Sequence, residues 1–491
     1  MSDGRVLRQQ RVDIGSLAVL SDAQASGVLQ LDLFADVSFR AVRERVERTA
    51  AGVAWIGSLE GYPHGQAVLV AAGDEFIGHI HAPFGFFRVE RQPAGFVVQQ
   101  RAEELPEQGS DLVRPPRTPG AASPPVTRAA AVDDEQVLDL LVVYTQMALK
   151  EFGSVTRASA AIDLAIAETN QALRTTGVDA RVRVVHTASV EYEESGEYRI
   201  ELARLVNASD GFLDTIFSLR DDYAADLVAL VTERLDDACG AAYLPESPSN
   251  AGFGWISVNR RRCLTDNLTL AHEIGHNLGA VHDWYDTPEG GAYPHSKGHV
   301  ALAARFRDIM STHYHCTDSN VTCPRMVTYA TPALIHQGAR LGVPIGTNTT
   351  CTARNPSNDP CDADLAHTFS NVAPLVAKYR DSRTALSARR LRPGESFRSP
   401  NGQYRLTYQA DGNLVLYDDV NQVPLWGTNT RGRSAGQALL QTDGNFVVSG
   451  SSGEVHWTSG TAGNPRAYLA VQNDGNLVIY RADGRPVWGR D

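Results

Sequence analysis

Three histidines and one glutamate lie close together in the sequence, at spacings that suit a single metal ion. His272 and His276 are four residues apart, so on a helix both imidazoles project from one face. Gly279 can take the positive φ that ends a helix, so that His282 supplies a third nitrogen. Three protein ligands leave a fourth position for water, as in a catalytic zinc site. Glu273 is then placed to act as general base on that water, which predicts Zn²⁺-dependent hydrolysis of peptide bonds.

The residues around this motif predict an α/β domain with a mainly parallel sheet. Apolar runs of strand length alternate with segments of helical periodicity, and the last strand leads into the helix that carries the histidines. We place this catalytic domain at residues 133–381. Its predicted strands cover residues 137–144, 180–185, 225–231 and 253–258, and its predicted helices cover residues 154–175 and 364–379.

The histidine motif resembles that of the metzincin zinc endopeptidases. In the reprolysin-like branch of that family the third histidine is followed by an aspartate, as His282 is followed by Asp283. Metzincins also carry a methionine beneath the zinc in a tight turn. Met310, in the sequence Asp-Ile-Met-Ser, looks like that Met-turn residue, and Met326 is the less similar alternative.

Shorter stretches resemble the bacterial peptidyl-Asp metalloendopeptidases over roughly residues 133–381. They are Ala-Asp-Leu-Val from Ala225, Cys-Gly-Ala-Ala-Tyr from Cys239, and Gly-Val-Pro-Ile-Gly from Gly342. The resemblance implies cleavage on the amino side of acidic residues. By analogy it also implies a disulfide between Cys239 and Cys263.

All the cysteines of the chain lie in one region, which indicates a set of disulfides formed in an oxidising compartment. Six cysteines allow 15 pairings, so their connectivity stays open. A second metal site is the alternative, but the sequence contains no Cys-X-X-Cys pair. The six residues are Cys239, Cys263, Cys316, Cys323, Cys351 and Cys361.

The N-terminal part of the chain has the pattern of a small β-rich domain. Residues 1–105 combine short apolar and alternating segments with turn residues, and residues 106–132 are rich in proline, serine, arginine and alanine, as in an exposed linker. A β-rich segment before a protease domain predicts an inhibitory pro-region with an activation segment. No cysteine precedes Cys239, so inhibition has to use a carboxylate, a histidine or simple blockage. The alternative is an accessory β-domain that the mature enzyme keeps.

The last hundred residues contain three copies of one motif, which predicts three similar β-units around a shared centre. Alternation along a strand puts the polar residues of each copy on one face, where they can hydrogen-bond to sugar hydroxyls. Trp426, Trp457 and Trp488 recur every 31 residues and are predicted to be core anchors. The predicted sugar-binding residues are Gln409, Asp411, Asn413, Val415 and Tyr417; Gln441, Asp443, Asn445 and Val447, beside Ser449 in place of the tyrosine; and Gln472, Asp474, Asn476, Val478 and Tyr480.

This motif resembles that of the bulb-type mannose-binding lectins, whose three four-stranded sheets form a β-prism. The resemblance covers residues 393–491, after a connector at residues 382–392, and implies binding of mannose-type glycans. The alternative is that these residues only shape turns, because Asp-Gly-Asn is also turn chemistry.

Composition sets the remaining limits. A net charge of −12 argues against a nucleic acid as the main partner, and no apolar run is long enough to span a membrane. The chain begins without a visible signal peptide, but the cysteines favour secretion. We therefore expect a secreted, multidomain zinc endopeptidase, made as a zymogen, that acts on proteins or peptides and is targeted by a lectin domain. The alternative is a mannose-binding adhesin or lectin-type antibacterial protein with a vestigial peptidase core.

Overall fold

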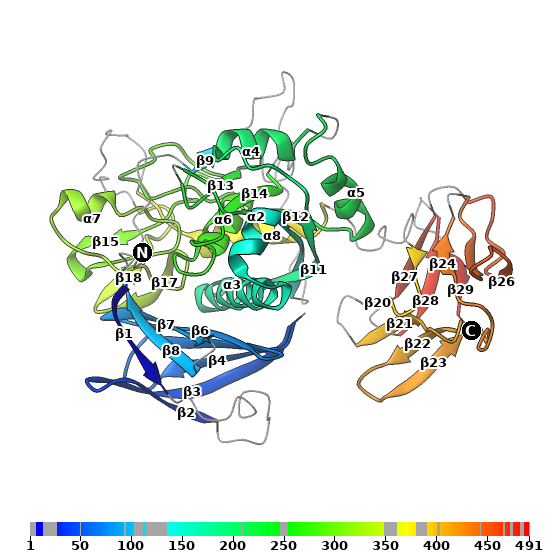
Figure 1. Cartoon of the computed structure of the whole chain (residues 1–491). Helices are drawn as coiled ribbons and strands as arrows, with labels where there is room; N and C mark the ends of the chain where they lie inside the picture. The colour runs from blue at the N-terminus through cyan, green and yellow to red at the C-terminus, as the bar shows by residue number, and fades with distance from the viewer. Residues whose placement is uncertain are drawn as a thin grey trace. The chain divides into compact units, whose positions relative to one another are not determined.

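The computed structural model describes residues 6–12, 27–49, 51–92, 95–102, 111–113, 135–207, 210–236, 238–245, 254–347, 361–379, 390–399, 403–441, 443–464, 467–471, 475–481 and 486–490. The chain divides into two compact units (Figure 1). The first unit comprises Met1–Asp214 and Leu227–Val376, and the second comprises Thr215–Asp226 and Ala377–Asp491.

The described part of residues 6–101 forms one antiparallel sheet of eight strands, which confirms the predicted β-rich N-terminal region. Its strand order is β1-β8-β7-β6-β5-β4-β3-β2. The strands are β1 (Val6–Val12), β2 (Val28–Phe34), β3 (Val37–Arg48), β4 (Val53–Leu59), β5 (Gln66–Ala72), β6 (Glu75–Ala82), β7 (Gly85–Gln92) and β8 (Gly95–Arg101).

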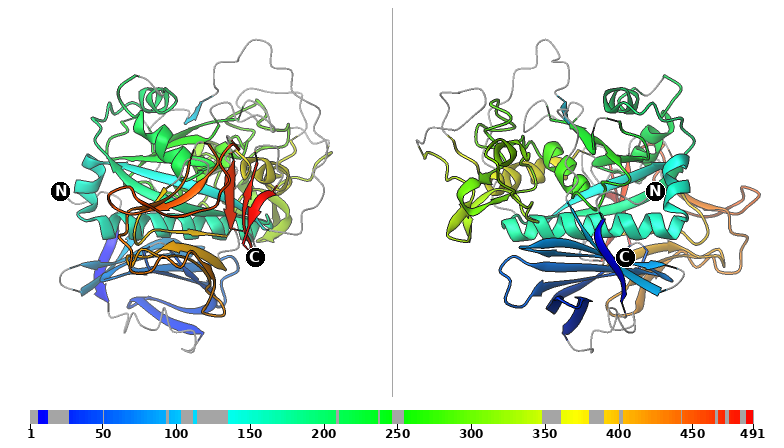
Figure 2. Two further views of the ribbon diagram at one scale, coloured as in Figure 1. Left: turned by 90° about the vertical axis from the view of Figure 1, so that its right-hand side faces the viewer. Right: turned by 60° about the vertical axis from the view of Figure 1, so that its left-hand side comes forward.

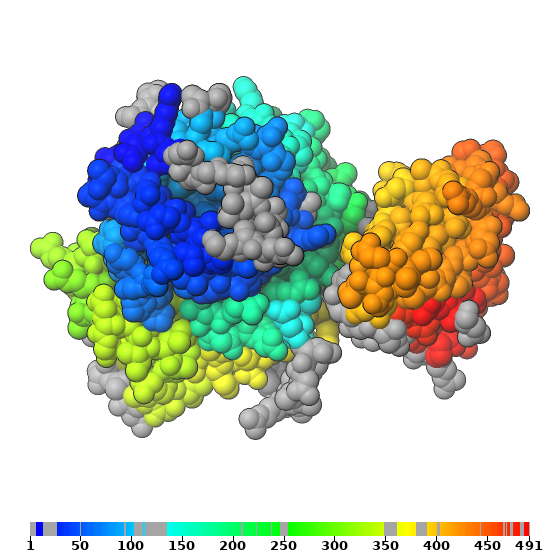
Figure 3. Space-filling view, turned by 90° about the horizontal axis from the view of Figure 1, so that it is seen from below, coloured from blue at the N-terminus to red at the C-terminus, as the bar shows by residue number. Residues whose placement is uncertain are grey.

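Both faces of this N-terminal sheet are packed. Successive residues of β5 enter different cores, with Leu69 in one and Val68 and Val70 in the other, as expected for side chains that alternate across a strand. Around the first core the sheet curls until its edge strands β1 and β2 contact each other, and the Gln10 side chain donates to the Leu33 carbonyl at 2.6 Å. Seen from below, the blue strands cover much of the first unit (Figure 3).

The second face of the N-terminal sheet packs on helix α3 (Val155–Thr176). Ala160, Leu164 and Ala167 recur at helical spacing and meet residues such as Ile56 and Val68 of the sheet. Small alanines let the helix approach the sheet closely, and Figure 2 shows α3 running across it. The N-terminal sheet and the helix therefore share a buried apolar interface.

A buried group of charged residues crosses the same interface, and sequence reasoning did not find it. Glu168 of α3 accepts from His79 Nδ1 at 2.7 Å and from His81 Nε2 at 2.9 Å. Nearby, the Asp266 carboxylate contacts Arg88 at 2.7 Å and Arg101 at 3.0 Å. Burial would raise the pKa of the Glu168 carboxyl, but the two histidines outweigh burial and hold that pKa below its usual value.

The second sheet of this unit has the order β11-β10-β12-β14-β13-β9 and is mainly parallel in its described residues. Only the β13–β14 pair is antiparallel among these strands. Every residue of β12 is buried, as expected where both faces of a parallel sheet are covered. The strands are β9 (Leu112–Val113), β10 (Gln136–Thr145), β11 (Ala180–Val190), β12 (Leu227–Thr232), β13 (Gly240–Tyr243) and β14 (Ile256–Arg260).

Helices surround this sheet, and the predicted helices at residues 154–175 and 364–379 correspond to α3 and α8. None of the helices in the described residues is long and apolar enough to cross a membrane. The remaining elements of this unit are α2 (Gln146–Phe152), α4 (Tyr198–Leu205), α6 (Thr269–Asn277), β15 (Val300–Ala301), the 3₁₀ helix η1 (Leu302–Ala304), β16 (Phe306–Arg307), α7 (Tyr314–Asp318), β17 (Thr331–His336), β18 (Ala339–Leu341) and α8 (Leu365–Val376).

The cysteines form disulfides, as the sequence predicted. Cys239 pairs with Cys263, the partners that the family resemblance implied, and Cys316 pairs with Cys323. Cys361 is also disulfide-bonded. Cys351 lies outside the described residues.

The second unit contains helix α5 (Thr215–Asp222) and small antiparallel sheets. Two described sheets have four strands, β19-β24-β25-β26 and β20-β21-β22-β23, and a third has three, β27-β28-β29. The strands are β19 (Arg390–Leu391), β20 (Ser396–Arg398), β21 (Tyr404–Tyr408), β22 (Leu414–Asp418), β23 (Val423–Gly427), β24 (Gln437–Leu440), β25 (Phe446–Ser449), β26 (Val455–Thr458), β27 (Tyr468–Val471), β28 (Leu477–Tyr480) and β29 (Pro486–Gly489).

The repeated tryptophans of this unit lie together, partly buried, against its apolar core. The rings of Trp426, Trp457 and Trp488 are 5.5 to 5.7 Å apart in edge-on pairs, and all three pack on the apolar core. This confirms that they anchor the core. Strand β19 lies inside the predicted connector at residues 382–392 and pairs with β24, so the ordered sheet begins before residue 393.

Candidate functional site

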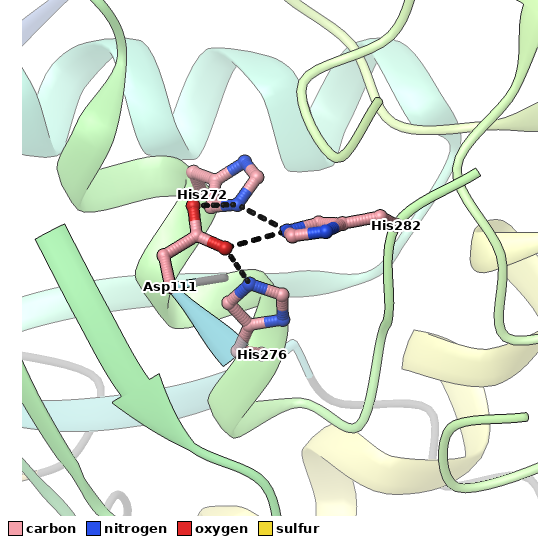
Figure 4. A group of neighbouring side chains, drawn as sticks. All are labelled: Asp111, His272, His276 and His282. Atoms are coloured by element: carbon pink, nitrogen blue, oxygen red, sulfur yellow. Dashed lines mark hydrogen bonds and ion pairs between the residues drawn. The ribbon is translucent and has the colours of Figure 1, made fainter. Parts of the chain in front are cut away.

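Helix α6 carries the first two predicted ligands, and the turn after it brings the chain back with the third. The rings of His272 and His276 are 4.7 Å apart on one face of the helix. Gly279 has the expected positive φ of 88°, and its N–H donates to the His276 carbonyl at 2.8 Å. The returning chain places the His282 ring 5.3 Å from that of His272 and 5.1 Å from that of His276 (Figure 4).

The three histidine rings are oriented by acceptors outside the group. Each Nδ1 atom meets an oxygen that can only accept, so each ring carries a proton on Nδ1 and turns its Nε2 toward the other two rings. For His272, His276 and His282 in turn, the acceptors are the Ile309 carbonyl at 2.8 Å, the Ala280 carbonyl at 2.9 Å and the Asp286 carboxylate at 2.8 Å.

The three Nε2 atoms fit a tetrahedral metal ion. The Nε2 atoms of His272 and His282 are 3.3 Å apart, and two nitrogens bound to one zinc at 2.0–2.1 Å are also about 3.3 Å apart. Among the described residues, the buried Nε2 of His276 has no hydrogen-bond partner. Lone pairs that face each other in a buried site are satisfied by a cation, so these residues fit a metal centre.

Glu273 is buried beside the histidines, and a glycine of β13 makes room for it. A Cβ atom on Gly240 would lie 2.5 Å from Glu273 Oε1. Within the described part of the chain, the other carboxyl oxygen, Oε2, has no hydrogen-bond partner. Burial and the nearby Asp111 carboxylate hold the pKa of the Glu273 carboxyl well above its usual value.

Met310 packs against helix α6 directly under the ligand-bearing turn. A Cβ atom on Gly275 would lie 2.3 Å from Met310 Sδ, so glycine permits this contact. The residue before it, Ile309, supplies the carbonyl that orients His272. Met326 packs instead in a separate small core around Phe306. The packing therefore favours Met310 over Met326 as the Met-turn residue.

Asp283 joins the chain after His282 to the chain after Met310. Its Oδ2 atom accepts from the Thr312 N–H at 2.9 Å and from the Thr312 hydroxyl at 3.2 Å, and its Oδ1 atom accepts from the Tyr285 N–H at 3.1 Å. The aspartate that follows the third histidine thus fixes that histidine relative to the Met310 turn.

One carboxylate of the predicted linker lies among the three histidines. Asp111 Oδ1 is 2.8 Å from His282 Nε2 and 3.8 Å from His276 Nε2, and Oδ2 is 3.3 Å from His272 Nε2 (Figure 4). Burial would raise the pKa of the Asp111 carboxyl, but the imidazoles of His282 and His272 outweigh burial and hold that pKa well below its usual range.

Sequence reasoning missed both Asp111 and Asp286. Residues 106–132 had the composition of an exposed connector, which hid the contact that Asp111 makes. One signal was present, because Glu107 and Asp111 are the only carboxylates in that segment and Asp111 alone precedes two aliphatic residues.

In the second unit, the first copy of the repeat gathers its polar residues around a turn. The prediction of one continuous strand with all five residues on a face is wrong, because β22 begins only at Leu414. Gln409, Asp411 and Asn413 belong to the turn before it, where Gly412 has a φ of 84°. The residues Asp, Gly and Asn favour a turn, and here this preference replaces the strand that the alternating pattern predicted.

The turn still brings the predicted residues of this copy together. Gln409 Nε2 donates to the Tyr417 hydroxyl at 2.8 Å. Asp411 accepts from the Asn413 N–H at 3.1 Å, and the Asn413 side-chain oxygen accepts from the Thr430 N–H at 3.0 Å. Val415 lies on β22, between Asn413 and Tyr417 in the sequence, and is buried. Two of the polar residues therefore shape the turn, while Gln409 and Tyr417 form a bonded pair.

The other copies repeat this arrangement in part. Asp443 and Asn445 make the same bonds as Asp411 and Asn413, but Ser449 bonds weakly to the Gln437 carbonyl at 3.4 Å. Val447 and Val478 are buried like Val415, and Gln441, Asn476 and Tyr480 reach the surface in full or in part. Gln472 and Asp474 lie outside the described residues.

A helix with the His-Glu-X-X-His motif, a third histidine after a glycine turn and a covered α/β sheet define a metallopeptidase domain. Residues 134–337 match the family described as "Metallo-peptidase family M12B Reprolysin-like", so the chain contains a reprolysin-like metallopeptidase domain. The peptidyl-Asp metalloendopeptidase of Stenotrophomonas maltophilia is 26% identical over 346 residues, which cover 66% of this chain and 80% of that protein.

The C-terminal part is a lectin-like β region. The mannose-specific lectin of Aloe arborescens is 46% identical over 59 residues, which cover 12% of this chain and 52% of that protein, so the match spans about half of that lectin. The solved mannose-specific agglutinin from snowdrop (Galanthus nivalis) bulbs is 40% identical, with 19% of this chain and 84% of that chain covered and a TM-score of 0.18.

Proposed function

We propose that this chain is a zinc endopeptidase in which His272, His276 and His282 hold Zn²⁺. The observation that carries this proposal is the orientation of the three rings, whose Nδ1 atoms are each bound elsewhere while the Nε2 atoms face one point. When bound, the ion supplies Lewis-acid polarisation of water and of a peptide carbonyl. Met310 supports the ligand helix from below its turn.

Glu273 is the general base of the proposed reaction. Its carboxylate takes a proton from the attacking water and returns it to the leaving amine. Its position against Gly240 sets it beside β13, a strand whose outer side an extended peptide substrate can join by backbone hydrogen bonds. The domain that performs this chemistry corresponds to residues 133–381.

Activity assays test this proposal directly. Processed enzyme should cleave casein, and a chelator should abolish cleavage until zinc is restored. Glu273→Ala should lower kcat by about 10²–10⁴-fold, the usual contribution of a general base, with zinc content unchanged. Chelator-insensitive cleavage would contradict the proposal, and a processed enzyme with no activity would favour the adhesin with a vestigial peptidase core.

We infer a preference for cleavage before acidic residues from the relatives, which are named peptidyl-Asp metalloendopeptidases. We assign this preference to Arg325, whose guanidinium donates to the Asn267 carbonyl at 2.7 Å and whose positive charge acts against the raised pKa of the Glu273 carboxyl. Cleavage-site profiling on a peptide library tests it. Arg325→Met should weaken the preference for aspartate and glutamate, and an unchanged profile would separate Arg325 from specificity.

We infer that residues 1–105 are a pro-region of a secreted zymogen and that residues 106–132 are its activation segment. The disulfides support an oxidising compartment, and the composition of the segment favours protease access. Terminal sequencing of the secreted protein is the test. A mature form that begins near residue 133 supports a pro-region, whereas one that still begins near Val6 supports an accessory domain.

We further infer that the C-terminal region, residues 393–491 with β19, binds mannose-type glycans and directs the enzyme to them. The Gln409–Tyr417 pair beside Asp411 and Asn413 supports this, since these groups offer donors and acceptors to vicinal hydroxyls. Full-length protein should bind mannan-coated beads and elute with methyl-α-mannoside. Tyr417→Phe should weaken retention, whereas Asp443→Asn in the copy that lacks the tyrosine should change it little.

A further inference from the structure

The segment Asp111–Val113 occupies the candidate metal centre from outside the peptidase domain. It lies between the N-terminal sheet and β10, and it is the described part of residues 103–134. The carboxylate of Asp111 contacts all three histidines, with distances of 2.8, 3.3 and 3.8 Å to their Nε2 atoms. Asp111 Oδ1 is buried and, among the described residues, has no hydrogen-bond partner, so what it faces are the ring nitrogens of His276 and His282.

The backbone of this segment holds the carboxylate in place. Strand β9 pairs in parallel with β13, with Leu112 opposite Ala242 and Val113 opposite Tyr243. The Ala242 N–H donates to the Asp111 carbonyl at 3.2 Å, and the Leu244 N–H donates to the Val113 carbonyl at 3.2 Å. These N–H groups, one on β13 and one on the residue just after it, are those that an extended substrate would need along this edge.

The chemistry of the contact is that of a metal ligand. Three histidine nitrogens leave one position of a tetrahedral zinc for water, and a carboxylate oxygen binds zinc at about the same distance as that water. The group that meets the three histidines is the side-chain carboxylate of Asp111, which is not a bond that the site could hydrolyse. A segment bound in this way blocks the water position and the substrate strand together.

We propose that Asp111 is the inhibitory fourth ligand of the metal and that β9 holds it there until the segment is cut. This inference rests on the proposed zinc site and states how the peptidase is kept inactive. No cysteine precedes Cys239 in the sequence, so a carboxylate takes the inhibitory role that a thiolate could otherwise fill. Cleavage in the flanking residues frees the segment, and water and substrate then take its two places.

Cobalt substitution of the full-length protein tests the proposal without relying on turnover. The Glu273→Ala background keeps the chain uncut, and Co²⁺ reports its own ligands through its visible absorption. Asp111→Ala and Asp111→Asn should each change this spectrum. Both should also raise the affinity for a fluorescent hydroxamate by about 100-fold or more, because the hydroxamate no longer competes with a tethered carboxylate. Asp111→Glu keeps a carboxylate and should stay closed.

The matched control is Asp74→Asn, which removes the same charge from a fully exposed turn of the N-terminal sheet. It should bind Co²⁺ and the hydroxamate as the parent does. Identical spectra and hydroxamate affinities for the parent and both Asp111 variants, at one Co²⁺ per chain, would overturn the inhibitory ligand and leave the metal site standing. Failure of every form to bind Co²⁺ would overturn the metal site and, with it, this inference.

Discussion

Two groups of histidines with a carboxylate lie in the first unit, and their ring nitrogens face different things. In the metal centre, each Nδ1 atom donates to an acceptor outside the group, and the Nε2 atoms face each other and Asp111. In the interface cluster of His79, His81 and Glu168, nitrogens of both rings contact one carboxylate oxygen at 2.7 and 2.9 Å. In the first group three Nε2 atoms converge on one point, whereas in the second both rings direct a nitrogen at the same oxygen of Glu168.

This difference shows that the convergence of histidines and a carboxylate does not by itself define a metal site. The groups behind the rings decide, because they fix which nitrogen carries the proton. By that criterion the interface cluster is a hydrogen-bonded contact between the N-terminal sheet and α3, and the group on α6 is the candidate metal site.

The largest expected effect separates the two groups by metal content. His276→Ala should reduce bound zinc from about one ion per chain to almost none at zinc concentrations near that of the protein, because a catalytic site has only three protein ligands. His81→Ala should leave zinc content unchanged. Elemental analysis of the dialysed variants measures both, and two ions per wild-type chain would break the distinction.

The second effect concerns stability. Glu168→Ala should lower the free energy of unfolding by about 3 kcal/mol, because it leaves the buried ring nitrogen of His79 without its carboxylate partner. Glu75→Ala removes a partner of Arg157 between the same strand β6 and the same helix, but that pair is partly exposed and should cost about 1 kcal/mol or less. Denaturant unfolding of the two variants gives the comparison, and equal losses would argue against a special role for the buried cluster.

A smaller effect tests the orienting groups. Asp286→Ala should weaken zinc binding by about 10–100-fold, because it removes the acceptor that holds His282 with Nε2 toward the metal. Asp286→Asn keeps an acceptor oxygen and should lose less. Competition with a chromophoric chelator measures these affinities. An unchanged affinity in both variants would show that the ring is held by packing alone.

The smallest effect is a pH dependence of the interface cluster. The pKa values of Glu168 and Asp266 are lowered in the folded chain despite burial, by His79 and by Arg88 with Arg101 respectively. A carboxyl with a lowered pKa contributes its full stabilisation above the unfolded value, here 4.5 for glutamate, and loses it as the pH falls through the folded value.

Unfolding free energies of the full chain should therefore decline as the pH falls below about 4.5. Glu168→Gln cannot titrate and should show a shallower decline. The same slope in wild type and variant would remove Glu168 from the acid response.

Much of the fold followed from local pattern. The buried runs 137–144 and 225–231 became the central parallel strands β10 and β12, because strands covered on both faces are continuously apolar. Gly279 ended helix α6 as expected, since a positive φ favours glycine. The polar residues of the first repeat were less predictable, because Gly412 and its neighbours form a turn where alternation suggested a strand.

The sequence by itself determined that three histidines would converge, because two histidines one helical turn apart and a third after a glycine are a local arrangement. It also predicted Glu273 as general base, Met310 as the Met-turn residue and the three repeats, because these depend on spacing along the chain. Only the tertiary structure decided what faces these residues from a distance. Asp111 and Asp286 act through contacts that no spacing encodes, and the Glu168 cluster joins elements almost ninety residues apart. Chain entropy leaves such pairings undetermined until the sheets and helices pack.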